Sequence, residues 1–204
     1  MRIPNEAHES GAWRIREIAP DFTLEDVWAL PAHGDAGEFE SVIALLASAD
    51  PAHGDSLPAR ALWDLRDRLG KWFGLGRTSE PPDGAGDELP IPGTDETSLA
   101  GRLADDLRGT AADVDLRSLP FVPLYLTVDE FAAEVSNPTM HGVLHLAWAD
   151  AGDGRRQAQM AVYVKPRGVL GKAYMELIKP FRYLIVYPTL MRQVERMWNA
   201  RVPH

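Results

Sequence analysis

The feature that most constrains the fold is the turn sequence Asp150-Ala-Gly-Asp-Gly, which has a segment of alternating polarity on each side. In residues 140–149 before the turn and 157–165 after it, apolar side chains occupy mostly every second position. Such alternation is typical of β-strands, and glycine beside aspartate favours a tight reversal of the chain. Together with a preceding strand at 131–136, the pattern predicts an antiparallel meander with one apolar face and one polar face.

A long helix is predicted after these strands, from about residue 170 to 198. Its apolar residues repeat every three or four positions, which is the spacing of one helix face. Pro180 and Pro188 have no N–H to donate, so a break is expected near Lys179 and a kink near Leu184. The predicted stripe consists of Leu177, Phe181, Leu184, Pro188, Met191, Val194 and Trp198.

Apolar spacing and turn residues also predict elements in the part of the chain before residue 131. Pro31 is expected to end the second of two extended segments. These elements are extended segments at 13–18 and 24–30, helices at 38–48 and 58–73, and a strand at 122–128.

Two regions do not follow a clear pattern. Residues 77–98 are rich in proline, glycine and acidic residues, and are expected to form a long flexible surface loop. In residues 98–108 the spacing of Leu99, Leu103 and Leu107 fits a short helix, but a strand is the alternative. With 204 residues and 45% hydrophobic residues, the chain is expected to form one domain over 1–204.

Composition excludes several classes of protein. The chain has no cysteine, which excludes disulfide scaffolds, thiolate metal sites and a cysteine nucleophile. The longest apolar run, residues 183–187, is too short to cross a bilayer, and the N-terminus does not resemble a signal peptide. We therefore expect a cytoplasmic protein that does not contact a membrane.

Charge is distributed unevenly along the chain. Residues 155–201 contain ten lysines and arginines and two acids, a balance of +8, whereas residues 1–154 contain eleven against twenty-eight, a balance of −17. The net charge of −9 argues against nucleic-acid binding. Segments of opposite charge can attract each other within one fold. The alternative is that the basic segment forms a surface or site that binds an anion.

The order of elements suggests an α+β fold in which a curved antiparallel sheet packs on a long C-terminal helix, often with an apolar cavity between them. Three strings resemble the DUF2867 family of uncharacterised bacterial proteins: LWDLRDRLGKWFGL at 62–75, EVSNPTMHGVLHLAW at 134–148 and AVYVKPRGVLGKAYMELIKPFRYLIVYP at 161–188. The resemblance implies the helix-grip fold of the START and Bet v 1-like (SRPBCC) superfamily. It covers nearly the whole chain and implies no activity.

Some relatives in that family carry a nucleotide-binding reductase domain before this one. This chain has no G-x-G-x-x-G motif after a predicted strand, and its Gly74-Leu-Gly and Gly84-Ala-Gly strings lie in loop-like context. We therefore expect no dinucleotide domain and no cofactor.

His141 and His145 invite a metal hypothesis, but four residues along a strand span about 13 Å. Two rings that far apart cannot both bind one ion, so no metal is expected. Glu134 and His141 can share the polar face of the meander. If that face lines a cavity, they are candidate catalytic residues for acid–base chemistry; if it is the convex, solvated face, they are ordinary surface residues. The convex, solvated interpretation is favoured, and a partner chain that covers this face is the third alternative.

The C-terminal KPFR element supplies further candidates. A buried Arg182 needs a carboxylate partner or a bound anion, and Asp64, Asp67 and Glu134 are the candidate partners. Core packing is the default interpretation of the tryptophans and tyrosines. The candidate ligand-binding residues are Trp63, Arg66, Trp148, Tyr163, Arg182 and Tyr187.

Three functional hypotheses follow. The first is a module that binds a small apolar or amphipathic metabolite between the sheet and the C-terminal helix, and it rests on architecture alone. The second is an enzyme of the cyclase, dehydratase or hydrolase kind that uses Glu134 and His141. The third is a homodimeric interaction protein with a collapsed cavity. Whether the chain is an enzyme stays open at this point.

Overall fold

A computed structural model describes residues 1–48, 98–116, 119, 121–137, 139–152 and 154–201. Six antiparallel strands form one curved sheet in the order β1-β2-β6-β5-β4-β3, so β1 and β3 are its edges. The α+β fold expected from the sequence is confirmed. The strands are β1 (Arg2–Ile3), β2 (Thr23–Gly34), β3 (Val122–Leu126), β4 (Glu130–Asn137), β5 (Met140–Gly152) and β6 (Arg155–Pro166).

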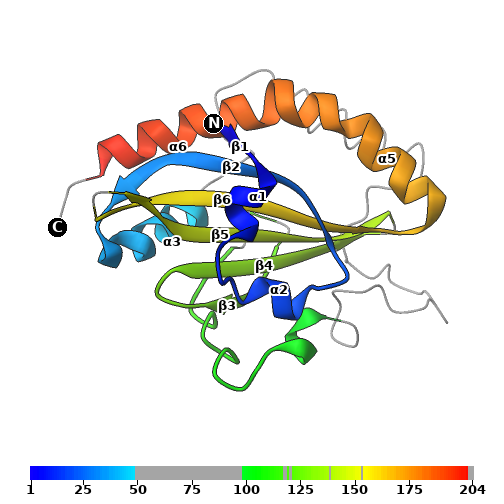
Figure 1. Cartoon of the computed structure of the whole chain (residues 1–204), viewed down its shortest axis with the longest axis horizontal. Helices are drawn as coiled ribbons and strands as arrows, with labels where there is room; N and C mark the ends of the chain where they lie inside the picture. Colours follow the sequence, from blue (N-terminus) through cyan, green and yellow to red (C-terminus); the bar gives the residue numbers. More distant parts are fainter. Residues whose placement is uncertain (49–97, 117–118, 120, 138, 153, 202–204) are drawn as a thin grey trace.

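The helices lie on both faces of the sheet (Figure 1). The helix and the loop expected at 58–73 and 77–98 lie outside the described residues, apart from Ser98. The helical elements are α1 (Asn5–Glu9), α2 (Ile15–Ile18), η1 (Ala36–Glu38), α3 (Phe39–Ala47), η2 (Leu99–Arg102), α5 (Gly168–Phe181), the π-helical η3 (Arg182–Val186) and α6 (Tyr187–Ala200).

The predicted meander is confirmed strand by strand. β4, β5 and β6 pair in sequence, and the reversal between β5 and β6 includes Gly152, at the end of β5, and Gly154, with φ of 89° and 75°. Both glycines adopt the left-handed backbone that other residues avoid, which explains the glycines in this turn. The helix expected at 38–48 is also confirmed, as α3.

Two expectations near the N-terminus are wrong. Residues 13–18 are not extended, because 15–18 form α2 and bury Ile15 and Ile18 on one helix face. Pro31 does not end the strand there, since β2 continues to Gly34. A register shift between Ala29 and His33 in the pairing with β6 accommodates the proline, which has no N–H for the ladder.

The C-terminal helix is irregular where the sequence predicts a kink. A π-helical turn, η3, spans Leu184, and α5, η3 and α6 together arch along the β2 side of the sheet (Figure 1). The break expected near Lys179 is absent, because α5 continues through Pro180. Only part of the predicted stripe is buried: Val194 and Trp198 are covered, whereas Leu177 and Leu184 are 62% and 77% exposed.

The sheet is covered on both faces. The helix face packs on α3, α6 and apolar residues of 111–116, and the opposite face, here called the N-terminal face, packs on α1, α2 and residues 98–107 (Figure 1). Leu146 and Met160 lie on the helix face, as alternation predicts. The expectation that Glu134 and His141 lie on a solvated face is wrong, because their side chains are 0% and 3% exposed.

Ion pairs join the basic C-terminal segment to the acidic first part of the chain, as the first interpretation of the charge pattern expects. The most buried is formed by Arg182 and Asp26, whose atoms lie 2.9 Å apart. The other pairs are Lys165 with Asp21, Lys179 with Glu25, and Arg201 with Glu38.

We predict that Gly171→Ala destabilises the protein by about 1–3 kcal/mol, the usual cost of overpacking. A methyl group on Gly171 would lie far inside contact distance of the Thr139 carbonyl oxygen, so α5 would have to move away from the β4–β5 turn. Chemical denaturation measures the loss. Gly101→Ala is the control, because its methyl group would meet no described atom within 4 Å. An equal effect of both substitutions would contradict this account of α5.

Candidate functional site

Glu134 and His141 form a buried pair on the N-terminal face. His141 Nε2 lies 2.9 Å from Glu134 Oε2. The same carboxylate accepts hydrogen bonds from the Leu99 N–H, at 3.0 Å, and from the Ser98 hydroxyl. The two groups are within the reach that acid–base chemistry needs, and their contacts also fasten η2 to the sheet. Their catalytic role stays a prediction.

A second pair, Glu130 with His145, repeats this arrangement one step along the hairpin. His145 Nε2 lies 3.1 Å from Glu130 Oε2, and the carboxylate also accepts from the Tyr125 hydroxyl and the Arg14 N–H. Burial alone would raise the pKa of Glu130, but these hydrogen bonds hold it below its usual value. The carboxylate is therefore ionised at neutral pH.

Strand register explains why both glutamates of β4 contact a histidine of β5 in the same way. Glu130 faces Ala147 and Glu134 faces Val143 across the β4–β5 ladder, so each acid is the diagonal neighbour of the histidine two residues earlier on β5. Sequence reasoning identified Glu134 and His141 but missed Glu130 and its partnership with His145. The signal was present, because both acids and both histidines are four residues apart.

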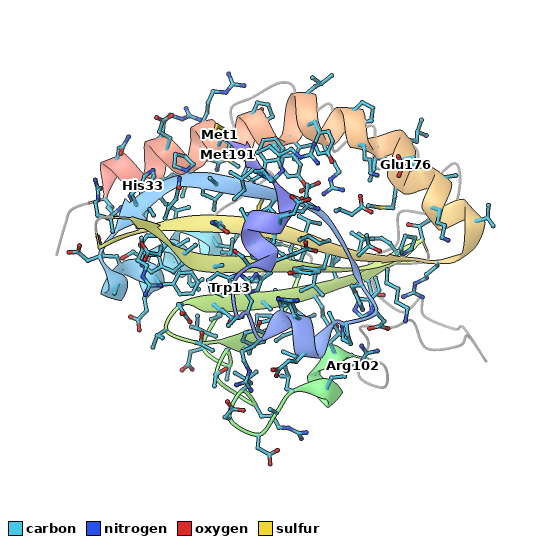
Figure 2. All side chains as sticks on the ribbon, viewed as in Figure 1. Met1, Trp13, His33, Arg102, Glu176 and Met191 are labelled. Atoms are coloured by element: carbon cyan, nitrogen blue, oxygen red, sulfur yellow. The ribbon has the colours of Figure 1, made fainter. Side chains whose placement is uncertain are left out.

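His8 of α1 packs against His145 of this second pair. Its ring centroid lies 5.1 Å from that of His145 in an edge-on contact, and it stacks on Trp13 at 5.7 Å. Figure 2 shows Trp13 on the face that α1 and α2 cover. Burial, and then the nearby His145, lower the pKa of His8 to about 4, so His8 is neutral at physiological pH.

The helix face carries a different polar cluster beneath η3. Arg182 lies 2.9 Å from Asp26 Oδ2 and donates to the Tyr187 hydroxyl, which donates to Asp26 Oδ1 at 2.9 Å. The Trp28 indole donates to the same carboxylate. Arg182 therefore has a structural carboxylate partner. Glu134, one of the partners expected from the sequence, belongs to the opposite face, and the other two lie outside the described residues.

An apolar cavity of about 50 Å³ lies on the helix face, between the sheet, α3 and α6. Among the described residues that line it, Gln193 alone is polar. The lining is formed by Leu30, Ala32, Leu144, Leu146 and Met160 of the sheet, Val42, Leu45 and Leu46 of α3, and Leu190, Gln193, Val194, Met197 and Trp198 of α6.

Of the predicted ligand-binding residues that the structure describes, it brings Arg182 and Tyr187 together but not Trp148 and Tyr163. Trp148 is fully buried between Phe39 and Trp198 and donates to the Asp35 carbonyl, which is a core position. Tyr163 lies on the N-terminal face, opposite Arg182 and Tyr187. None of these four described residues lines the cavity, and Trp63 and Arg66 lie outside the described residues.

We predict that Asp26→Asn lowers the free energy of unfolding by about 3 kcal/mol, because it leaves the Arg182 guanidinium largely buried without a counter-charge. Adding Arg182→Met should recover part of this loss. Asp21→Asn is the control: its pairs with Arg102 and Lys165 are exposed, so the expected loss is below about 1 kcal/mol. Equal losses at Asp21 and Asp26 in urea denaturation would contradict this assignment.

Comparison with known proteins adds one assignment. No helix among the described residues has the length and apolar character needed to span a membrane. No curated protein and no solved structure matches the sequence. The sequence profile of the DUF2867 family, described as proteins of unknown function, matches residues 18–189. That range includes β2 to β6 and the polar side chains described on both faces of the sheet, except His8, Trp13 and Arg14. A match over this much of the chain shows that it belongs to the DUF2867 family.

Proposed function

We propose that this protein binds a small apolar or amphipathic molecule in the cavity between the sheet, α3 and α6. This proposal treats the fold as a helix-grip domain of the START and Bet v 1-like kind, in which sheet and C-terminal helix enclose the ligand. The observation that carries it is the lining of the cavity, which among the described residues is apolar except at Gln193. Empty apolar cavities exclude water and accept apolar guests.

The volume limits what the guest can be. Sites for drug-sized ligands usually enclose about 300–1,000 Å³, far more than the 50 Å³ found here. A guest is therefore either very small or the apolar end of a longer molecule. Met160 and Met197 line the cavity with flexible thioether side chains, which can rearrange to enlarge it. A polar end would lie near Gln193.

Acid–base catalysis is a second candidate function. The 2.9 Å contact between Glu134 and His141 favours it, since a base and its proton partner must be this close. Ser98 and Leu99 also bind the Glu134 carboxylate, so η2 would have to move before a substrate could reach it. The two candidates use opposite faces of the sheet and are separable by mapping where a ligand binds.

Native mass spectrometry of the protein purified from its own host tests the first proposal. The intact mass under gentle conditions is compared with the denatured mass. A reproducible excess mass that is lost on denaturation identifies the class of bound molecule. Repeated absence of such a mass, combined with no change in the NMR signals of the cavity methionines when 1-octanol is added, would refute ligand binding in this cavity.

We predict that 1-octanol, used as a chain probe, shifts the NMR signals of the Met160 and Met197 methyl groups and leaves that of the exposed Met1 unchanged. Ala32→Val should abolish these shifts, because it places two further carbon atoms in the cavity. Filling a cavity also retains or raises the melting temperature, which distinguishes blocked binding from a damaged fold. Unchanged octanol shifts in the folded variant would place the guest elsewhere.

A further inference from the structure

Besides Arg14 Nε, three buried polar atoms on the N-terminal face have no hydrogen-bond partner among the described residues: His8 Nε2, His145 Nδ1 and the Tyr163 hydroxyl oxygen. They belong to neighbouring rings. The centroid of His8 lies 5.1 Å from that of His145 and 6.2 Å from that of Tyr163, and the last two lie 6.3 Å apart. Unpaired buried polar atoms are costly, and three in one cluster suggest that something binds between them.

The hydrogen bonds on the other side of each imidazole define what the unpaired nitrogens offer. His145 Nε2 faces the ionised Glu130 carboxylate, which only accepts, so the proton is on Nε2 and Nδ1 carries a lone pair. His8 Nδ1 lies 3.3 Å from the side-chain oxygen of Gln159, which likewise leaves the Nε2 lone pair free. Burial lowers the pKa of both histidines, so both rings are neutral.

Two neutral imidazoles held this way match the ligands of a metal site. Metal-binding histidines usually donate their other N–H to a carboxylate or a carbonyl oxygen, which fixes the ring and strengthens the ligand. Glu130 is itself held by Tyr125 and the Arg14 N–H, so this outer layer is rigid. The other pair on this face, Glu134 with His141, differs, because neither ring nitrogen of His141 is among the buried atoms without a partner.

The spacing of the rings agrees with this interpretation. A ring nitrogen lies about 1.1 Å from its centroid and binds a metal at about 2.0–2.1 Å, so two imidazoles on one tetrahedral ion have centroids about 5 Å apart. The observed separation of His8 and His145 is 5.1 Å. The Tyr163 ring lies 6.2 and 6.3 Å from the two histidine rings, and its hydroxyl is buried without a partner among the described residues.

We propose that His8, His145 and Tyr163 bind one divalent first-row transition-metal ion. Nε2 of His8 and Nδ1 of His145 are the nitrogen ligands, and the Tyr163 hydroxyl binds the ion directly or through a water molecule. Imidazole ligands suit zinc, cobalt, nickel and copper rather than magnesium or calcium. The described residues contain no group of three His, Cys, Asp or Glu side chains that could hold a metal ion, so the proposed site differs from such groups in joining two imidazoles to a phenol.

This site was not expected from the sequence, where His141 with His145 was the pair considered. It lies on the opposite face from the apolar cavity and does not depend on the proposed ligand. Its consequence is structural: because His8 belongs to α1 and His145 to β5, the ion would join the N-terminal segment to the sheet. Metal should therefore raise the melting temperature in proportion to its affinity.

Titration of the full chain with cobalt(II), after removal of metals by a chelator, tests the proposal. We expect one equivalent to bind with the visible absorption of a four- or five-coordinate nitrogen and oxygen site, and zinc to displace it. His8→Gln should lower the affinity at least about 100-fold, since it removes a ligand rather than an outer-layer group. The exposed His33 gives the control: His33→Gln should leave binding unchanged.

Tyr163→Phe distinguishes loss of a metal ligand from loss of folding. It removes only a hydroxyl group that has no described partner, so the metal-free variant should melt at the wild-type temperature or above. We expect its cobalt affinity to fall about tenfold and the absorption bands to shift. The proposal is overturned if cobalt and zinc leave the wild-type melting temperature unchanged, as they would if only water fills the cluster. It is also overturned if His8→Gln binds cobalt like the wild type, because the ion then lies elsewhere.

Discussion

Burial of both faces of the sheet is the constraint on which the rest of this structure depends. Alternation along β4, β5 and β6 places polar side chains on the N-terminal face, and α1, α2 and residues 98–107 then remove that face from water. Each polar group there has to find a partner inside the protein. Glu130 and Glu134 do so by accepting hydrogen bonds from the same segments that bury them. The covering segments and the polar face of the sheet therefore stabilise each other.

How much of the fold the sequence predicts depends on how far apart along the chain the interacting residues lie. Strand alternation and the turn at 150–154 are local, and they predicted the meander and the side on which each residue points. The cover over the N-terminal face was missed because its elements are too short for periodicity: α2 has four residues. Leu99, Leu103 and Leu107 are buried as their spacing suggested, yet only the first lies in a regular turn, η2.

The site residues show the same limit. Glu134 and His141 were found because they lie seven residues apart on a predicted hairpin. Arg182 was correctly expected to need a carboxylate, but its partner Asp26 is 156 positions away and is aligned only by the full strand order. His8 approaches His145 from an N-terminal helix of five residues, so sequence pattern could not place the two rings together. Tertiary neighbours of this kind emerge only from the assembled fold.

The two edges of the sheet determine how copies of this chain can associate. β1 has two residues, and β3 contains Pro123 and a register shift in its pairing with β4, so the two edge strands are short or irregular. Extension of the sheet from one molecule to the next is therefore disfavoured. Side-chain packing is the other route to self-association, and Leu177 and Leu184 of the C-terminal arch are among the exposed apolar groups of the described residues.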